Sequence, residues 1–159
     1  MKNFPVLFFL ALAVFLSGCS GKGKGSKAPQ LDLLEVFPDS LRAGNPYDTV
    51  YIHFYMLDED GDIGWDQDQD QNYDIYIKDS RIDTFAGYFF PLIDKEIKDL
   101  KKGLEGEGYF FLRGDFMTLR DDSIHQATGD TTQLQMYIQD RKGNKSNTVD
   151  IGTIYIRPL

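Results

Sequence analysis

Apolar and polar residues alternate along several short segments of this chain. The alternation is clearest over residues 50–56 (VYIHFYM), where every second residue is aliphatic, Phe or Met and the residues between them are Tyr or His. A period of two predicts a β-strand with one buried face, and it places Tyr51, His53 and Tyr55 on the outer face. Further candidate strands lie at 31–37, 73–77, 84–90, 108–113, 134–138 and 149–156. About seven short strands separated by turn residues predict an all-β, antiparallel sandwich.

Two segments depart from simple alternation. In the last candidate strand the apolar phase changes at Gly152, which indicates a β-bulge. Between Pro91 and Gly103 the apolar residues recur at helical spacing, a proline opens the segment and a glycine closes it. We therefore expect one short crossover helix packed across an edge of the sandwich. A helix that binds a partner is the alternative.

The N-terminus has the features of a secretory signal. One basic residue, Lys2, precedes an almost wholly apolar run over residues 4–16, which is short for a membrane span. The sequence LSGC at 16–19 resembles the bacterial lipobox. This resemblance implies that residues 1–18 are a lipoprotein signal peptide and that Cys19 becomes the acylated, palmitate-bearing first residue of the mature protein. The alternative is an ordinary cleaved signal followed by an incidental cysteine.

The rest of the chain divides into a tether and one domain. Residues 20–30 hold three glycines, three lysines and no large apolar side chain, so they cannot build a packed core. We therefore assign 19–30 to the lipidated cysteine and a flexible tether, and 31–159 to the β-sandwich. That length fits a single domain.

Charge and cysteine content exclude several classes of protein. The chain has 17 basic and 25 acidic residues and a formal net charge of −8, whereas binding to nucleic acid needs clustered Lys and Arg. A single cysteine cannot form an internal disulfide or a cysteine-based metal cage. We expect no nucleic-acid partner.

An acidic loop follows the clearest strand. Residues 58–74 contain eight carboxylates and no basic side chain, and close carboxylates repel one another unless a cation compensates. Calcium suits such a loop, since it takes six to eight oxygen ligands in flexible geometry. Glycines at 61 and 64 would let the backbone fold back. An EF-hand is excluded because its sixth position, counted from Asp58, is Ile63 and not Gly. The alternative is a solvated loop without a metal.

A second turn, over residues 140–147 (DRKGNKSN), reads as a hairpin between the last two strands. In a sandwich this hairpin emerges at the same end as the acidic loop. We therefore expect a calcium site whose ligands come from both loops. The expected ligands are Asp58, Asp60, Asp62 and Asp140, with Asn144 and Asn147 as further candidates. The alternative is that Arg141, Lys142 and Lys145 face the acidic loop as ion pairs.

The same two loops carry a family resemblance. HFYMLDEDGDIG at 53–64 and IQDRKGNKSNTV at 138–149 resemble segments of uncharacterised lipoproteins of Bacteroidota-type bacteria, in which a DGDGDIG-type loop and a DRAGNKSN-type hairpin belong to an immunoglobulin-like or fibronectin-III-like domain. The resemblance implies that fold and an outer-membrane location. This chain departs from the family pattern in having Glu59 where Gly is common.

These observations predict a non-catalytic lipoprotein of the cell envelope. The β-sandwich would serve as a binding or structural module, stabilised by calcium and anchored to the outer membrane by its lipid, with an unknown protein or glycan as partner. The stretch after Cys19 is basic and lacks the acidic run that resembles a surface-export signal, so we expect the periplasmic side.

Two other functions stay open. A subunit of a larger envelope complex could use Tyr51 and Tyr55 as an exposed aromatic patch. A hydrolase could use carboxylates of the acidic loop as acid and base. The enzyme is the weaker alternative, because G-x-S-x-G, H-E-x-x-H and phosphate-loop motifs are missing. His53 on an outer strand face and His125 in a polar stretch are also poor candidates for a catalytic base.

Overall fold

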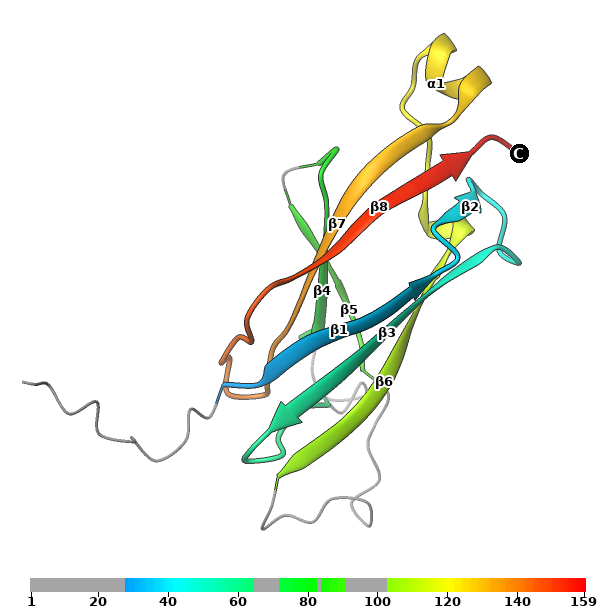
Figure 1. Cartoon of the computed structure of the whole chain (residues 1–159). Helices are drawn as coiled ribbons and strands as arrows, with labels where there is room; N and C mark the ends of the chain where they lie inside the picture. The colour runs from blue at the N-terminus through cyan, green and yellow to red at the C-terminus, as the bar shows by residue number, and fades with distance from the viewer. Residues whose placement is uncertain (1–27, 65–71, 83, 91–102) are drawn as a thin grey trace, which may run out of the picture.

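Two sheets of strands face each other in this protein. The computed structural model describes residues 28–64, 72–82, 84–90 and 103–159, and the strands within them form one sheet of order β1-β3-β6 and another of order β2-β8-β7-β4-β5 (Figure 1). Their bounds are β1 (Gln30–Phe37), β2 (Ser40–Arg42), β3 (Thr49–Asp58), β4 (Ile75–Asp79), β5 (Phe85–Tyr88), β6 (Leu104–Arg113), β7 (Asp130–Ile138) and β8 (Val149–Arg157). Neighbouring strands are antiparallel except β2 and β8, which run parallel. The predicted all-β, immunoglobulin-like sandwich is confirmed.

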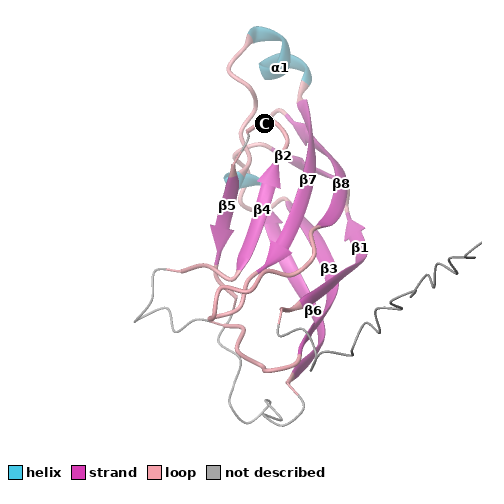
Figure 2. Cartoon of the chain, turned by 90° about the vertical axis from the view of Figure 1, so that its left-hand side faces the viewer, coloured by secondary structure: helices cyan, strands magenta, loops and turns pink. Residues whose placement is uncertain are grey.

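Helical structure in the described ranges is confined to the connection between β6 and β7. It consists of the 3-10 turn η1 (Gly114–Phe116) and the helix α1 (Ser123–Thr128), whose first turn is capped by the side chain of Asp122. Helix α1 stands at the end of the sandwich opposite to the loop that follows β3 (Figures 1 and 2). None of these described helices is long and apolar enough to span a membrane.

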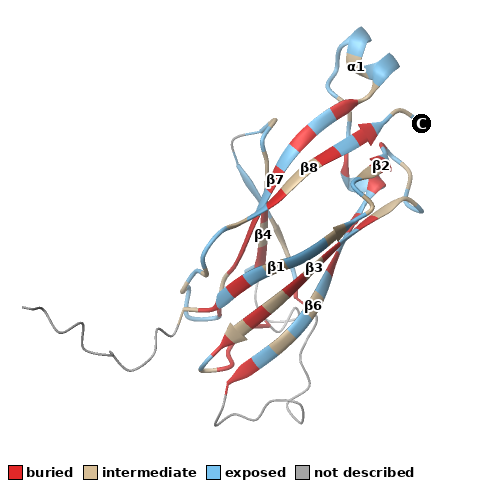
Figure 3. Ribbon diagram, viewed as in Figure 1, coloured by how far each residue is buried: buried red, intermediate tan, exposed pale blue. Residues whose placement is uncertain are grey.

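Buried residues of both sheets form one hydrophobic core, and Figure 3 shows them in red along the strands. In β3, Ile52 and Phe54 are fully buried, whereas Tyr51 beside them is 45% exposed. Met136 of β7 and Ile154 of β8 are fully buried on the other sheet. Burial of side chains of this size contributes about 1.5–3 kcal/mol each and is the main favourable term in folding. The alternation of the sequence thus identified the buried face of β3 correctly.

The last strand is continuous across its change of phase. Gly152 pairs with Leu134 and Asp150 pairs with Gln135, so one extra residue lies between them on β8. Gly152 adopts a φ of 96°, which glycine tolerates better than other residues. The predicted bulge is confirmed. The apolar residues before the bulge follow one phase of the alternation, and those after it follow the other.

Other boundaries differ from those expected. β6 begins at Leu104 and not at 108. The sequence did not indicate this earlier start, because Gly106 and Gly108 carry no side chain and so hide the alternation of the strand. β1 begins at Gln30, one residue before the expected start of the domain. The short elements β2 and α1 were not predicted. Several predictions fall on residues that the structure does not describe: the signal peptide expected over 1–18, Cys19, most of the expected tether, and the helix expected over 91–103, apart from Gly103.

The two glycines of β6 differ in their surroundings, which permits a test of the packing. A Cβ atom on Gly108 would lie 2.8 Å from the buried ring of Phe54, whereas one on Gly106 would meet no atom within 4 Å. We predict that Gly108→Ala lowers the free energy of unfolding by about 1–3 kcal/mol through overpacking. Gly106→Ala, the matched control, should stay within about 0.5 kcal/mol of the parent. Urea unfolding measures both, and equal effects would contradict the packing of Phe54 against β6.

Candidate metal centre

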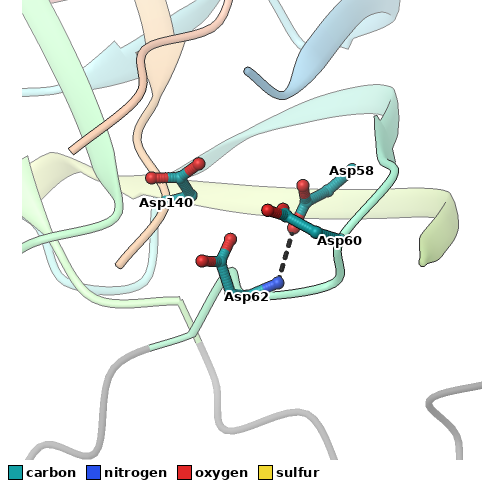
Figure 4. A group of neighbouring side chains, drawn as sticks. All are labelled: Asp58, Asp60, Asp62 and Asp140. Carbon is teal, nitrogen blue, oxygen red and sulfur yellow. Dashed lines mark hydrogen bonds between the residues drawn. The ribbon is translucent and has the colours of Figure 1, made fainter. Parts of the chain in front are cut away.

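Four aspartates from two connections converge at one end of the sandwich. Asp58 is the last residue of β3, Asp60 and Asp62 lie in the turn that follows, and Asp140 begins the hairpin between β7 and β8 (Figure 4). One carboxylate oxygen from each residue lies within 4.8 Å of the others. The two loops therefore meet as expected, and these four residues are the ones that the sequence singled out.

The carboxylate of Asp58 shapes its own loop. Its Oδ2 atom accepts hydrogen bonds from the backbone N–H groups of Asp62, at 2.8 Å, and Ile63, at 3.2 Å. Gly61 has a φ of 64°, which lets the chain turn back toward Asp58. The side chain of Ile63 then enters the core, where it is fully buried. These contacts fix the backbone so that Asp60 and Asp62 point toward the same space as Asp58.

Gly103, which is distant in sequence, packs closely against this turn. Gly103 precedes β6 and has a φ of 77°. A Cβ atom on Gly103 would lie 2.1 Å from the carbonyl oxygen of Asp58, a distance that no side chain could occupy. The close approach of β6 to the turn thus depends on glycine at this position.

The hairpin holds Asp140 in a similar way. Its Oδ1 atom accepts hydrogen bonds from the backbone N–H groups of Lys142, at 2.9 Å, and Asn144, at 2.8 Å. The amide of Asn144 donates to the Oδ2 atom of Asp140 at 2.7 Å. Gly143, with a φ of 85°, occupies the left-handed turn position that the sequence indicated. Asp140 is fully buried, and Asn144 orients its carboxylate.

Arg141 joins the two loops, whereas Asn147 contacts the start of β1. The carbonyl oxygen of Asp62 accepts hydrogen bonds from the backbone N–H of Arg141, at 3.2 Å, and from its Nε, at 2.8 Å. The amide of Asn147 accepts from the N–H of Leu31 at 2.9 Å and donates to the carbonyl of Leu31 at 2.7 Å. The structure therefore does not bring Asn147 into the cluster, but uses it to attach the hairpin to the start of β1.

A further acidic residue of the loop has a structural role that the sequence did not reveal. Asp74 is fully buried, and its two carboxylate oxygens accept hydrogen bonds from the N–H groups of Gly64 and Phe90, both at 3.0 Å. It thereby closes the far end of the acidic loop. Residues 65–71, with the remaining aspartates of the loop, lie outside the described residues.

Three carboxylate oxygens in the cluster have no hydrogen-bond partner in the described structure, although they are buried. They are the Oδ1 atoms of Asp58, Asp60 and Asp62. Asp58 is fully buried, and this burial, followed by the effects of Asp60 and Asp62, raises the pKa of its carboxyl group to about 6. A buried acceptor without a partner costs about 1–3 kcal/mol. The cluster is therefore short of positive charge.

One lysine supplies part of that charge. The Nζ atom of Lys142 lies 2.6 Å from Asp60 and 2.8 Å from Asp62. Its amine lowers the pKa of Asp60, and the two carboxylates raise the pKa of Lys142 well above its usual value. More than half of the lysine side chain is exposed, so its amine is free to exchange with solvent cations. The expected alternative of ion pairs across the loops is thus realised by Lys142, whereas Lys145 lies over the ring of Tyr137.

The opposite end of the sandwich shows how the same fold neutralises buried acids with its own side chains. There the guanidinium of Arg81 contacts Asp79 at 2.6 Å and Asp130 at 3.1 Å. Hydrogen bonds from Arg81 help to lower the pKa of both carboxyl groups, despite the opposing effect of burial. At the cluster of Asp58 no arginine side chain plays this part among the described contacts, and the pKa of the buried carboxyl is raised instead.

The four carboxylates have the chemistry and spacing of a site for a hard cation. Calcium binds oxygen at about 2.3–2.6 Å, so two ligands on opposite sides of the ion lie about 4.6–5.2 Å apart. The four carboxylate oxygens all lie within 4.8 Å of one another, close enough to contact one cation together. The cluster could thus bind a metal ion.

Comparison of this chain with protein-family models, with curated proteins and with solved structures found no match.

Proposed function

We propose that this protein is a non-catalytic β-sandwich module of the cell envelope, anchored by a lipid on Cys19 to the periplasmic side of the outer membrane. One calcium ion, held by Asp58, Asp60, Asp62 and Asp140, stabilises the end of the sandwich. The observation that carries the calcium site is the unpartnered Oδ1 atom of Asp58, a fully buried carboxylate oxygen that faces three other carboxylates.

Calcium would supply to all four carboxylates the positive charge that Lys142 supplies to only two of them. The lysine amine reaches Asp60 and Asp62, whereas the free oxygen of Asp58 receives no hydrogen bond from it. A calcium ion among the four carboxylates would contact that oxygen directly and displace the exposed lysine into solvent. Because the carboxylates are already positioned by backbone N–H groups, little ordering would accompany binding.

The hydrogen bonds of the cluster support a structural rather than a catalytic role. Asp58 uses one oxygen to hold its own turn, and Asp140 uses both oxygens to hold the hairpin. Carboxylates in this arrangement maintain the shape of two loops. A general acid or base needs one carboxylate that exchanges a proton with a substrate.

The anchor rests on the sequence at the N-terminus and fits the place where the domain begins. The tether leads directly into β1, whose first residue, Gln30, pairs with Leu57 next to Asp58. The lipid would therefore hold the protein by the end that carries the metal centre.

We predict that calcium stabilises the purified mature protein with a Kd of about 0.1–1 mM, as is typical of extracellular modules. At ten times Kd, binding to the folded state alone adds about 1.4 kcal/mol, which raises Tm by a few degrees. Calorimetric titration and thermal melting measure both effects, and magnesium should have a smaller one. Asp60→Asn with Asp62→Asn should remove the shift, whereas Asp39→Asn with Asp121→Asn, an equal change of charge at exposed sites, should keep it. A melting curve that calcium and EDTA leave unmoved would refute the site.

Lys142 provides a separate test of the same site. Because its amine competes with the metal for Asp60 and Asp62, Lys142→Met should tighten calcium binding about three- to tenfold, equivalent to roughly 1 kcal/mol. The calcium-free variant should also melt at a lower temperature than the parent. Lys145→Met removes the same charge from a lysine that lies over Tyr137, and it should change neither quantity appreciably. Equal calcium affinities in the two variants would show that Lys142 does not occupy the metal position.

The lipid anchor can be tested at Cys19, the only thiol of the chain. We predict that Cys19→Ala abolishes acylation and moves the protein from the membrane fraction to the soluble fraction, because no second lipid signal is present in residues 19–30. Fractionation of cells that express each form, together with the mass of the mature protein, measures this. Complete retention of the variant in detergent-extracted membranes would show that the lipobox reading is wrong.

A further inference from the structure

The solvent-facing side of the sheet β1-β3-β6 has two chemically distinct ends. Cross-strand pairing places Phe37, Tyr51 and Phe111 in one row and Glu35, His53 and Tyr109 in the next. The third row consists of Asp32, Tyr55 and Glu107. We call these three rows, together with Glu105, the outer face. Its aromatic end consists of the rings of the first row and Tyr109, and its acidic end consists of the carboxylates at 32, 35, 105 and 107.

The aromatic end is large, exposed and already ordered. Phe37 is 68% exposed, Tyr109 56% and Phe111 53%. The rings of Tyr51 and Phe111 meet edge to face at 5.4 Å, and those of His53 and Tyr109 stack at 4.3 Å. The solvated face of an antiparallel sheet normally carries polar residues. Exposed aromatic rings that already hold one another in place are typical of an interaction surface, because little freedom is lost on binding.

Carboxylates line the acidic end. The hydroxyl of Tyr55 donates to Glu105 at 2.5 Å, and His53 contacts Glu107 at 2.9 Å. These contacts hold both carboxylates over the sheet beside the rings. Asp32 and Glu35 add two further exposed acids from β1.

The charge of the outer face has one sign. The basic residue that continues its β6 column is Arg113, beyond the aromatic end, where its guanidinium pairs with Asp115 and lies 5.2 Å from the ring of Phe116. The acids of the outer face therefore have no arginine or lysine partner among the described ion pairs. His53, when protonated, would be the one positive group among them.

We propose that the outer face docks a basic segment of a partner protein. Its arginine or lysine side chains would lie over the rings of Tyr109 and Phe111 and pair with Glu105 and Glu107, so that each cation gains a ring and a carboxylate at once. This proposal names a partner for the binding role proposed above, but it depends on neither the calcium ion nor the lipid.

Charge complementarity selects this occupant. A second copy of the chain, docked through the same face, would bring no arginine or lysine of that face to these acids, so they would lose water without gaining a cationic partner. Anionic headgroups and nucleic acids are repelled for the same reason. A neutral glycan could stack on the rings but would leave the carboxylates without a cationic partner.

The test uses the purified full-length protein in detergent with saturating calcium, so that the metal centre does not attract the probe. The probe is a ten-residue peptide in which arginine alternates with threonine, and its control carries citrulline, which has the same shape without the charge. We expect the arginine peptide to bind at least tenfold more tightly than the citrulline peptide. Amide NMR shifts should change along β3 and β6 and not around Asp140.

Matched variants locate the binding. Tyr109→Ser with Phe111→Ser should weaken binding of the arginine peptide at least tenfold, and so should Glu105→Gln with Glu107→Gln. Tyr47→Ser, at a ring that is 92% exposed but lies off the outer face, should leave binding unchanged. Thermal melting confirms that each variant is folded.

Three results would overturn the proposal. They are equal affinity for the two peptides, shift changes confined to the metal centre, and binding of a neutral oligosaccharide such as cellohexaose where the arginine peptide fails. None of them bears on the calcium titration or on acylation, so failure here is separable from failure of the proposed function.

Discussion

A carboxylate buried at the end of a strand is the constraint on which this end of the molecule depends. Asp58 lies where β3 leaves the sheet, and one of its oxygens organises the next turn by accepting two backbone N–H groups. That carboxylate is fully buried, and its second oxygen has no hydrogen-bond donor among the described residues. Around this carboxylate lie Asp60, Asp62 and, in the hairpin, Asp140. The carboxylates that gather around Asp58 repel one another, and Lys142 compensates the charge of Asp60 and Asp62 but does not reach Asp58.

The carboxylates at the two ends of β7 are compensated by positive charge in different ways. Asp130 is the first residue of β7 and belongs to a network with Arg81, whose planar guanidinium reaches two carboxylates and is itself mostly buried. Asp140 follows β7 beside an exposed lysine that reaches two other carboxylates. The first arrangement is complete within the chain. The second is adjustable, because a flexible amine can leave without exposing the core, and this difference is why the metal centre is proposed at only one of them.

How much of this could be predicted from the sequence depends on how local each signal is. The alternation of β3 and the glycine-bearing turn at 143 are local patterns, and both were identified correctly. The meeting of Asp58 with Asp140 followed from strand topology. Asp74 could not be separated from its acidic neighbours, because its role is fixed by Gly64 and Phe90, which only the fold brings together. The same holds for Asn147, whose partner Leu31 is 116 residues away in the sequence.

The contacts of Asn147 also connect the metal centre to the tether. This residue binds both backbone groups of Leu31, so ordering of the hairpin by a cation at Asp140 would also hold the start of β1 in the sheet. A lipid anchor would pull on the chain at this point. The outer face runs away from it along β3: Tyr51 lies six residues from Leu57, and at about 3.3 Å per residue its row stands about 20 Å further from the anchored end. Under the proposed function, a metal ion at one end of the sheet and the aromatic residues at the other would suit a module that is fixed at its base and meets its partner beyond the membrane surface.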